Sequence, residues 1–243
     1  MLDRLRKVGC PYVTDQPDPV VAKWVRWIEG PLVDDVVALH FRRQIWRGIN
    51  GMATATPGVG DYPSAFWDYN RDCYVVTQAI GIRRLADMSR GVISLAKLID
   101  EMKTAAKASR FTRATFLSQW GVSDDLLARR AEEGWRLFAG GGEHFDSRLA
   151  DADLEILRGD SENIKDYVDQ YVAHRAERPK LTDVPTFEDL HRAIDDLGDM
   201  FKKYSQVLKA AHWATLEPVG QEDWRAIFRV PWNQPDPPVE PWT

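Results

Sequence analysis

The sequence predicts an all-α protein, an up-and-down helical bundle with extra helices at its N-terminus and an irregular C-terminal tail. Over most of the chain, apolar residues recur at the three- and four-residue spacing of an amphipathic helix. Helix caps precede many of these segments, and the alternating pattern of a half-buried strand is nearly absent. The 243 residues suffice for one large domain or two small ones, with a sizeable core.

The first predicted helix begins at Asp18, an N-cap residue, followed by Pro19 at the first helical position. The pair Gly30-Pro31 ends this helix and starts the second. Residues 51–64 contain the densest turn chemistry in the chain, so we expect a loop there.

A third helix is predicted to begin near Ala65. We expect it to bury one apolar stripe, made of Tyr69, Cys73, Val76, Ile80 and Leu85. Another helix follows Gly91, a short one is expected over residues 111–120, and Ser123 caps a further one. The run Gly140–Gly142 breaks that helix.

The next helix is predicted from about Asp151, with a pause at Gly159, and it ends at Arg178-Pro179. The segment Thr186–Asp189 resembles a capping box with Asp in place of Glu. It opens the helix with the cleanest apolar stripe, formed by Leu190, Ile194, Leu197, Phe201, Tyr204 and Leu208. We divide the chain into an N-terminal arm (1–19), a helical domain (20–210) and a Trp- and Pro-rich tail (211–243).

Composition limits the classes of function. Lys and Arg number 32 against 37 Asp and Glu, and the formal net charge of −5 excludes nucleic-acid binding by bulk charge but allows a local basic face. Two cysteines cannot build a disulfide framework or a four-ligand zinc site. The five histidines are scattered, so we expect neither a metal nor a cofactor. Without a signal peptide or a membrane-length apolar run, the chain is expected in the cytoplasm.

Ten tryptophans are the unusual feature of the composition. Six lie on or beside predicted helices, and the other four mark the tail: Trp213, Trp224, Trp232 and Trp242. Exposed aromatics in a Pro-rich segment suit either docking onto a partner protein or a strap across the bundle itself.

The segment 82–90 (IRRLADMSR) places three arginines at the end of an apolar helix. Arg83 and Asp87 are four residues apart and can form an ion pair on one helix face. One interpretation is a helix C-terminus whose arginines offset the dipole. The other is a contact surface for RNA, because guanidinium groups bind phosphate through paired hydrogen bonds; Arg83, Arg84 and Arg90 are its candidates.

The segment 166–175 (DYVDQYVAHR) is the second candidate. Its apolar face takes Tyr167, Val168, Tyr171 and Val172, which leaves Asp166, Gln170 and His174 on a polar stripe. His174 is suited to acid/base chemistry on a phosphodiester. The alternative is a solvated histidine that hydrogen-bonds Gln170 and has no further role.

Together these segments resemble the AbiU2-like branch of the HEPN superfamily. The resemblance rests on Ile82-Arg83-Arg84-Leu85-Ala86-Asp87, on Ile93-Ser94-Leu95 through Leu98, and on Asp169 through Ala173-His174, in that order, with Pro185 and the helix that carries Tyr204 also fitting. It covers about residues 20–210 and implies a bundle of four or five helices that dimerises. It also implies a metal-independent RNase of toxin or abortive-phage-defence systems, with RNA as the partner.

The chain departs from the family's catalytic pattern at one point. Catalytic HEPN proteins carry an Arg with four to six residues between it and the His, whereas these positions are Asp169, Val168 and Tyr167 here. Arg175 follows His174 instead and points about 100° away on a helix. Either another arginine (Arg83, Arg84 or one from a dimer mate) supplies the cation, or the nuclease function is lost.

Two functions remain open from the sequence. The first is a HEPN-like RNase in antiviral defence, with His174, Arg83 and Arg84 as catalytic candidates and with substrate contacts from Arg90, Asp169, Gln170 and Arg175. The second is a non-catalytic helical module that binds a protein partner or nucleic acid, with the tail as one docking segment. We expect a homodimer in either case.

Overall fold

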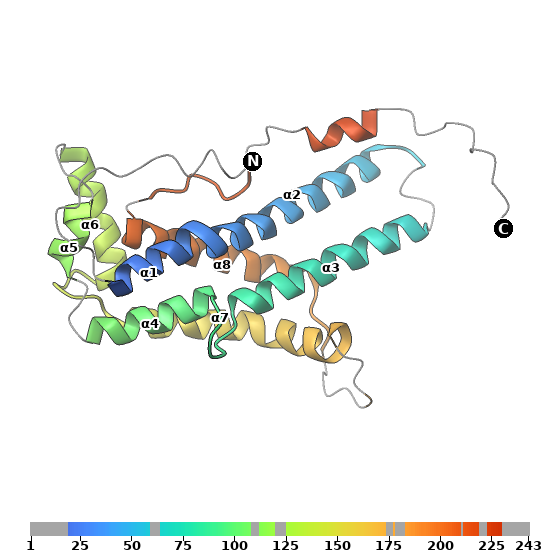
Figure 1. The fold of residues 1–243 in the computed structure, drawn as a ribbon. Coiled ribbons are helices and arrows are strands. Elements are labelled where there is room, and N and C mark those ends of the chain that lie inside the picture. Colours follow the sequence, from blue (N-terminus) through green and yellow to red (C-terminus); the bar gives the residue numbers. More distant parts are fainter. Residues whose placement is uncertain are drawn as a thin grey trace, which may run out of the picture.

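The computed structural model describes residues 19–58, 64–107, 112–119, 125–173, 177, 183–209, 211–218 and 223–229. Within these ranges the regular structure is helical, and the only β feature is an isolated bridge between Thr112 and His144. The predicted all-α class is therefore confirmed (Figure 1). No described helix has the length and apolar character needed to span a membrane.

Four long helices form the bundle: α2 (Val33–Ala55), α3 (Ala65–Leu85), α7 (Ser147–Tyr167) and α8 (Phe187–Lys209). Each packs on the next in a closed ring, α2 on α3, α3 on α7, α7 on α8 and α8 on α2. Figure 1 shows α2 and α3 running antiparallel after the turn that joins them. Their buried faces share one core, which supports the predicted up-and-down arrangement.

Side-chain caps define where three of these helices begin. The Ser64 hydroxyl accepts the Phe66 N–H at the start of α3 (3.2 Å), and Asp146 does the same for the Arg148 N–H at the start of α7 (2.9 Å). At α8 the Thr186 N–H donates to Asp189 (2.9 Å), and the Asp189 N–H donates to the Thr186 hydroxyl (3.1 Å). The predicted capping box is thus confirmed.

The N-terminal helix α1 (Pro19–Trp27) is joined to α2 by the kinked segment Ile28–Leu32. Gly30 leaves helical geometry inside this segment (φ −114°, ψ −105°), and Pro31 has no N–H to continue the ladder. Gly30-Pro31 therefore separates α1 from α2 at a kink, which confirms the predicted boundary.

Three shorter helices complete the domain. Helix α4 (Leu95–Lys107) packs along α7, while α5 (Arg113–Gln119) and α6 (Asp125–Ala139) contact each other and α8. Gly140 (φ 60°) and Gly141 (φ 90°) adopt left-handed geometry just after α6, which confirms the predicted break.

The described part of the tail lies against the bundle. Trp213 packs on Phe201 of α8 with ring centroids 5.6 Å apart, and Leu216 is buried. The 3₁₀ helix η4 (Trp224–Arg229) covers α2, where a Cβ added to Gly48 would lie 2.5 Å from the Trp224 ring. We call this packed part of the tail the strap; Trp232 and Trp242 lie outside the described residues.

Several sequence predictions are wrong in detail. On α3 the predicted buried stripe faces outward, with Tyr69, Cys73 and Ile80 exposed. Burial falls instead on a neighbouring stripe that includes Tyr74, Gln78, Ala79 and Ile82, although Leu85 is buried as expected. Helix α2 continues to Ala55 through part of the predicted loop, and α7 begins before Asp151 and runs through Gly159 without a pause.

Candidate functional site

The last turn of α3 directs its two adjacent arginines to different neighbours. Consecutive residues on a helix point about 100° apart, so Arg83 and Arg84 cannot share a partner on one helix. Nε of Arg83 lies 2.8 Å from Oδ1 of Asp169, in the turn that follows α7, whereas Arg84 ion-pairs with Asp35 on α2. Of the two sequence candidates, only Arg83 reaches the segment that precedes His174.

Asp169 holds two cations at once. Nζ of Lys165 donates to Oδ2 of Asp169 at 2.9 Å, while Arg83 takes the other oxygen. The hydrogen bond from Lys165 and the charge of Arg83 hold the pKa of the Asp169 carboxyl below its ordinary value. The carboxylate therefore stays ionised and forms an ion pair with the Nε edge of Arg83.

A π-turn, η3 (Val168–Val172), carries Asp169 and Gln170. It is closed by a bond from the Ala173 N–H to the Val168 carbonyl, 2.7 Å long and spanning five residues instead of four. Of the predicted apolar face, Val168 is buried, but Tyr171 is exposed and stacks on Tyr167. The predicted apolar face is therefore only partly buried.

The other predicted site residues are placed only in part. His174 and Arg175 lie outside the described residues. Gln170 is half-buried on η3, and Arg90 is exposed in the loop after α3 without an ion pair to a described residue. The expected Arg83–Asp87 pair does not form: the Asp87 carboxylate instead accepts the Ser89 N–H at 2.8 Å.

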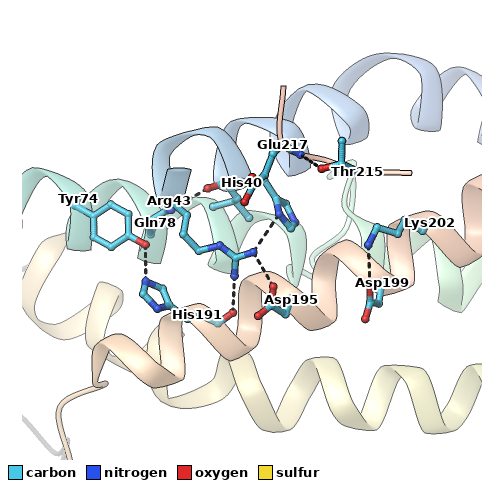
Figure 2. Close-up of polar contacts among 11 residues, drawn as sticks. His40, Arg43, Tyr74, Gln78, His191, Asp195, Asp199, Lys202, Thr215 and Glu217 are labelled. Carbon is cyan, nitrogen blue, oxygen red and sulfur yellow. Dashed lines mark hydrogen bonds and ion pairs between the residues drawn. The ribbon is translucent and has the colours of Figure 1, made fainter. Parts of the chain in front are cut away.

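A second polar cluster lies where α2, α3 and α8 meet (Figure 2). Its centre is Arg43, whose side chain is only 5% exposed. One Nη donates to the carbonyl of His191 (3.1 Å), and the other lies 2.7 Å from Asp195 and 3.3 Å from Nδ1 of His40. A buried cation is thus compensated by a carboxylate, a backbone carbonyl and a neutral ring.

The two histidines of this cluster are both kept neutral. Burial, followed by the charge of Arg43, lowers the pKa of His40 to about 4. Burial also lowers the pKa of His191, with Arg47 and Arg43 adding to the effect. The Tyr74 hydroxyl and Nε2 of His191 share a hydrogen bond of 2.9 Å. We interpret this cluster as a polar lock that joins three helices.

Sequence reasoning missed the polar lock because its members come from distant segments. The available signal was local: His40, Arg43 and Gln78 occupy positions of α2 and α3 that face the core, where a polar residue needs a partner. Three buried atoms of the cluster remain without a hydrogen bond to a described residue, namely Nε2 of His40, Nε of Arg43 and Oε1 of Gln78.

Among the described residues, no group of three His, Cys, Asp or Glu side chains is arranged to hold a metal ion. In the comparisons with known proteins, a family model described as AbiU2, of the HEPN type, matches residues 22–227. The match extends past residue 210 into the strapped part of the tail. No curated protein and no solved structure matches the chain.

Proposed function

This chain belongs to the AbiU2 family of HEPN proteins, a family associated with abortive infection, and we propose that it is a metal-independent RNase acting on cytoplasmic RNA. One observation carries the proposal. The contact between Arg83 and Asp169 joins the start of the Ile82–Asp87 motif to the start of the Asp169–His174 motif. A cation from α3 thereby stands beside the turn in which the family's usual arginine is absent.

In this proposal Asp169 replaces the missing arginine by recruiting one from another helix. The carboxylate holds the Nε edge of Arg83 and leaves the Nη groups to meet a phosphate. Arg84 is excluded from that role because it pairs with Asp35 on the α2 side. Arg90, which is exposed, and Arg175 remain candidates for further phosphate contacts.

The chemistry needs only a proton carrier and a charge stabiliser. His174 takes the proton of a ribose 2′-hydroxyl, and the 2′-oxygen forms a bond to the adjacent phosphorus. The bond from phosphorus to the 5′-oxygen breaks, and this oxygen takes up a proton. The products are a 2′,3′-cyclic phosphate and a 5′-hydroxyl end. Arg83 stabilises the negative charge that develops on the phosphoryl oxygens.

The adjacent arginines provide a matched test. Purified wild-type protein is incubated with tRNA and mRNA beside the variants His174→Ala, Arg83→Gln and Arg84→Gln, and the products are resolved on gels. We expect His174→Ala and Arg83→Gln to lower the cleavage rate by about 10²-fold or more. Arg84→Gln removes the same charge one residue away and is expected to retain activity.

Equal cleavage patterns for wild type and His174→Ala would remove the nuclease proposal. That outcome favours the second candidate, a non-catalytic module that binds a protein or nucleic-acid partner. A tail-mediated version of that candidate has weaker support, because Trp213, Leu216 and Trp224 pack on their own bundle.

We also propose that the protein is a homodimer. The outward stripe of α3, formed by Tyr69, Cys73 and Ile80, has the spacing of a buried helix face yet is exposed in the single chain. A second copy that packs on this stripe would remove its apolar surface from water.

A further inference from the structure

A groove of about 940 Å³ lies between α7, α4 and the loop that joins α3 to α4. Along α7 it extends from Asp151 to Asp166, and at 1.5 Å per residue this corresponds to about 22 Å, or four helical turns. Its lining positions on α7 recur every three or four residues, as in Leu154, Arg158 and Ser161. The groove therefore follows one face of α7 and has the length of a helix of about 16 residues.

The floor of the groove is apolar. Leu157 and Ala96 are buried at its base, and Leu154 and Ala86 line it beside them. At its rim Met88 is 45% exposed, and a flexible apolar side chain of this kind adapts to different partners. An apolar floor of this length suits the apolar face of an amphipathic helix.

The charges of the groove are unbalanced once its ion pairs are assigned. Lys103 pairs with Asp151 and Arg158 with Glu155, while Arg83 and Lys165 share the single carboxylate of Asp169. Its remaining carboxylates, Asp87, Glu162 and Asp166, form no ion pair with a described residue. Carboxylates therefore outnumber cations along the groove, and this excess of negative charge attracts basic side chains.

We propose that this groove binds a basic amphipathic helix of a protein partner, and that the bound helix inhibits the protein by covering Arg83. Its apolar face would lie on Leu154, Leu157 and Ala96, while its Lys or Arg side chains would meet Asp87, Glu162 and Asp166. Arg83 lines the end of the same groove, so the occupant and an RNA phosphate compete for one place. This inhibitory role rests on the proposed nuclease function, whereas the binding of the helix does not.

The binding test uses a synthetic helix of about 16 residues as probe, with Leu on one face and Lys along both edges. Fluorescence anisotropy with the full chain is expected to show saturable binding that weakens as salt is raised. The double variant Glu162→Lys/Asp166→Lys is expected to lower the affinity by about tenfold or more. The control Glu133→Lys/Glu188→Lys makes the same charge change on α6 and α8 and is expected to bind like wild type.

The proposal is contradicted if the basic helix does not bind up to about 100 µM, or if a Glu-edged helix binds equally well. It is also contradicted if the two double variants bind the helix equally, or if the chain self-associates and the groove variant alone abolishes this. The last result would identify a second copy as the occupant. Single-stranded RNA that binds the wild type and is lost on changing Lys103 and Arg158 would likewise show that the groove is an RNA surface.

The cleavage assay separates this proposal from the nuclease proposal. If both hold, the basic helix inhibits RNA cleavage by wild type and by the control variant, but not by Glu162→Lys/Asp166→Lys. If the helix binds as expected and His174→Ala leaves cleavage unchanged, the nuclease proposal fails and the groove remains a partner site.

Discussion

His40 is neutral because its ring is enclosed by its own helix and by α8. A Cβ added to Gly198 would lie 2.5 Å from Nε2 of His40, so a glycine is required where α8 passes the ring. Nδ1 of His40 accepts from an Nη of Arg43, which leaves the ring proton on Nε2. Protonation would place a second positive charge beside Arg43, and this explains a pKa of about 4.

This pKa predicts a specific pH dependence of stability. The unfolded chain has a His pKa of about 6.5, so between pH 6.5 and 4 the unfolded state binds a proton at His40 that the folded state does not. The contribution of His40 is thus present above pH 6.5 and falls with pH, by up to about 1.4 kcal/mol per unit. His40→Asn keeps an acceptor for Arg43 without a titrating ring. Urea unfolding between pH 7 and 4.5 should show that the free energy of unfolding of this variant falls less steeply with decreasing pH than that of wild type.

The exposed His144 supplies the control for that experiment. His144→Asn is expected to follow the wild-type pH profile, since its side chain lies outside the polar lock. Equal slopes for wild type and His40→Asn would contradict the assignment of a neutral buried ring.

The pKa shift of Asp196 is opposite in direction to that of His40, and so is its effect on the pH dependence of stability. Burial, followed by the neighbouring Asp160 carboxylate, raises the pKa of Asp196 to about 6. The folded state therefore holds this proton more tightly than the unfolded state, and its effect on stability is lost as pH rises from about 4 through 6. Asp196→Asn should raise the melting temperature at pH 7 and have little effect at pH 4. Asp72→Asn, an exposed change on α3, controls for net charge. If Asp196→Asn leaves the melting temperature at pH 7 unchanged, repulsion between Asp196 and Asp160 is excluded.

At the residue scale, the sequence alone cannot distinguish the roles of two adjacent arginines. Arg83 and Arg84 have the same chemistry and the same helix end, so the sequence ranks them equally. Only the packing of α3 between α2 and η3 separates them, through Asp35 and Asp169. Both partners lie far away along the chain, and no local pattern encodes them.

At the scale of elements, α3 shows how periodicity can select the wrong face. Apolar and aromatic residues occur around most of its circumference, and two stripes of helical spacing fit equally well. One contains Tyr69 (68% exposed) and Ile80 (44% exposed), and the other contains Tyr74 and Ile82, which are buried. Contacts with α2, α7 and α8 decide between them, whereas the capping box at Thr186–Asp189 and the break after α6 depend on local residues and are confirmed.

Because η4 packs on α2, we expect the effect of Gly48→Ala on stability to change sign when Trp224 is removed. An alanine at an exposed helix interior is about 1 kcal/mol more favourable than glycine. Here the new Cβ would lie 2.5 Å from the Trp224 ring, so Gly48→Ala should lower the melting temperature or detach the strap. In a Trp224→Ala background the clash is absent, and Gly48→Ala should then stabilise the protein. Thermal melts of the four proteins measure this; equal effects of Gly48→Ala in both backgrounds would show that η4 does not lie on α2.

For the whole molecule, the outward stripe of α3 predicts the oligomeric state. Tyr69→Arg/Ile80→Glu places two charges on this stripe and should convert a dimer to a monomer without changing the helical content. Size-exclusion chromatography with light scattering gives the mass, and circular dichroism reports the fold. Leu137→Glu, at an exposed position of α6, serves as the control. A wild-type monomer at micromolar concentration, or a dimer that survives both changes on α3, would contradict this interface.

The sequence predicted the class and order of the helices because caps, breakers and apolar spacing are local signals. It did not predict the groove or the polar lock, since both exist only where helices from separate segments meet. The Arg83–Asp169 contact lies between these cases: both motifs were identified, but their pairing depends on how α3 packs on α7 and η3.

The π-turn η3 has a consequence for comparing this chain with its relatives. A π-turn accommodates one more residue than an α-helical turn, so the register at Ala173 differs by one position from that of an unbroken α-helix. A relative with an unbroken α-helix in this region would place the equivalent of Ala173 one position earlier in its own numbering. Aligning the two therefore requires a one-residue gap within residues 168–172, and a spacing rule counted without that gap pairs residues that are not spatially equivalent.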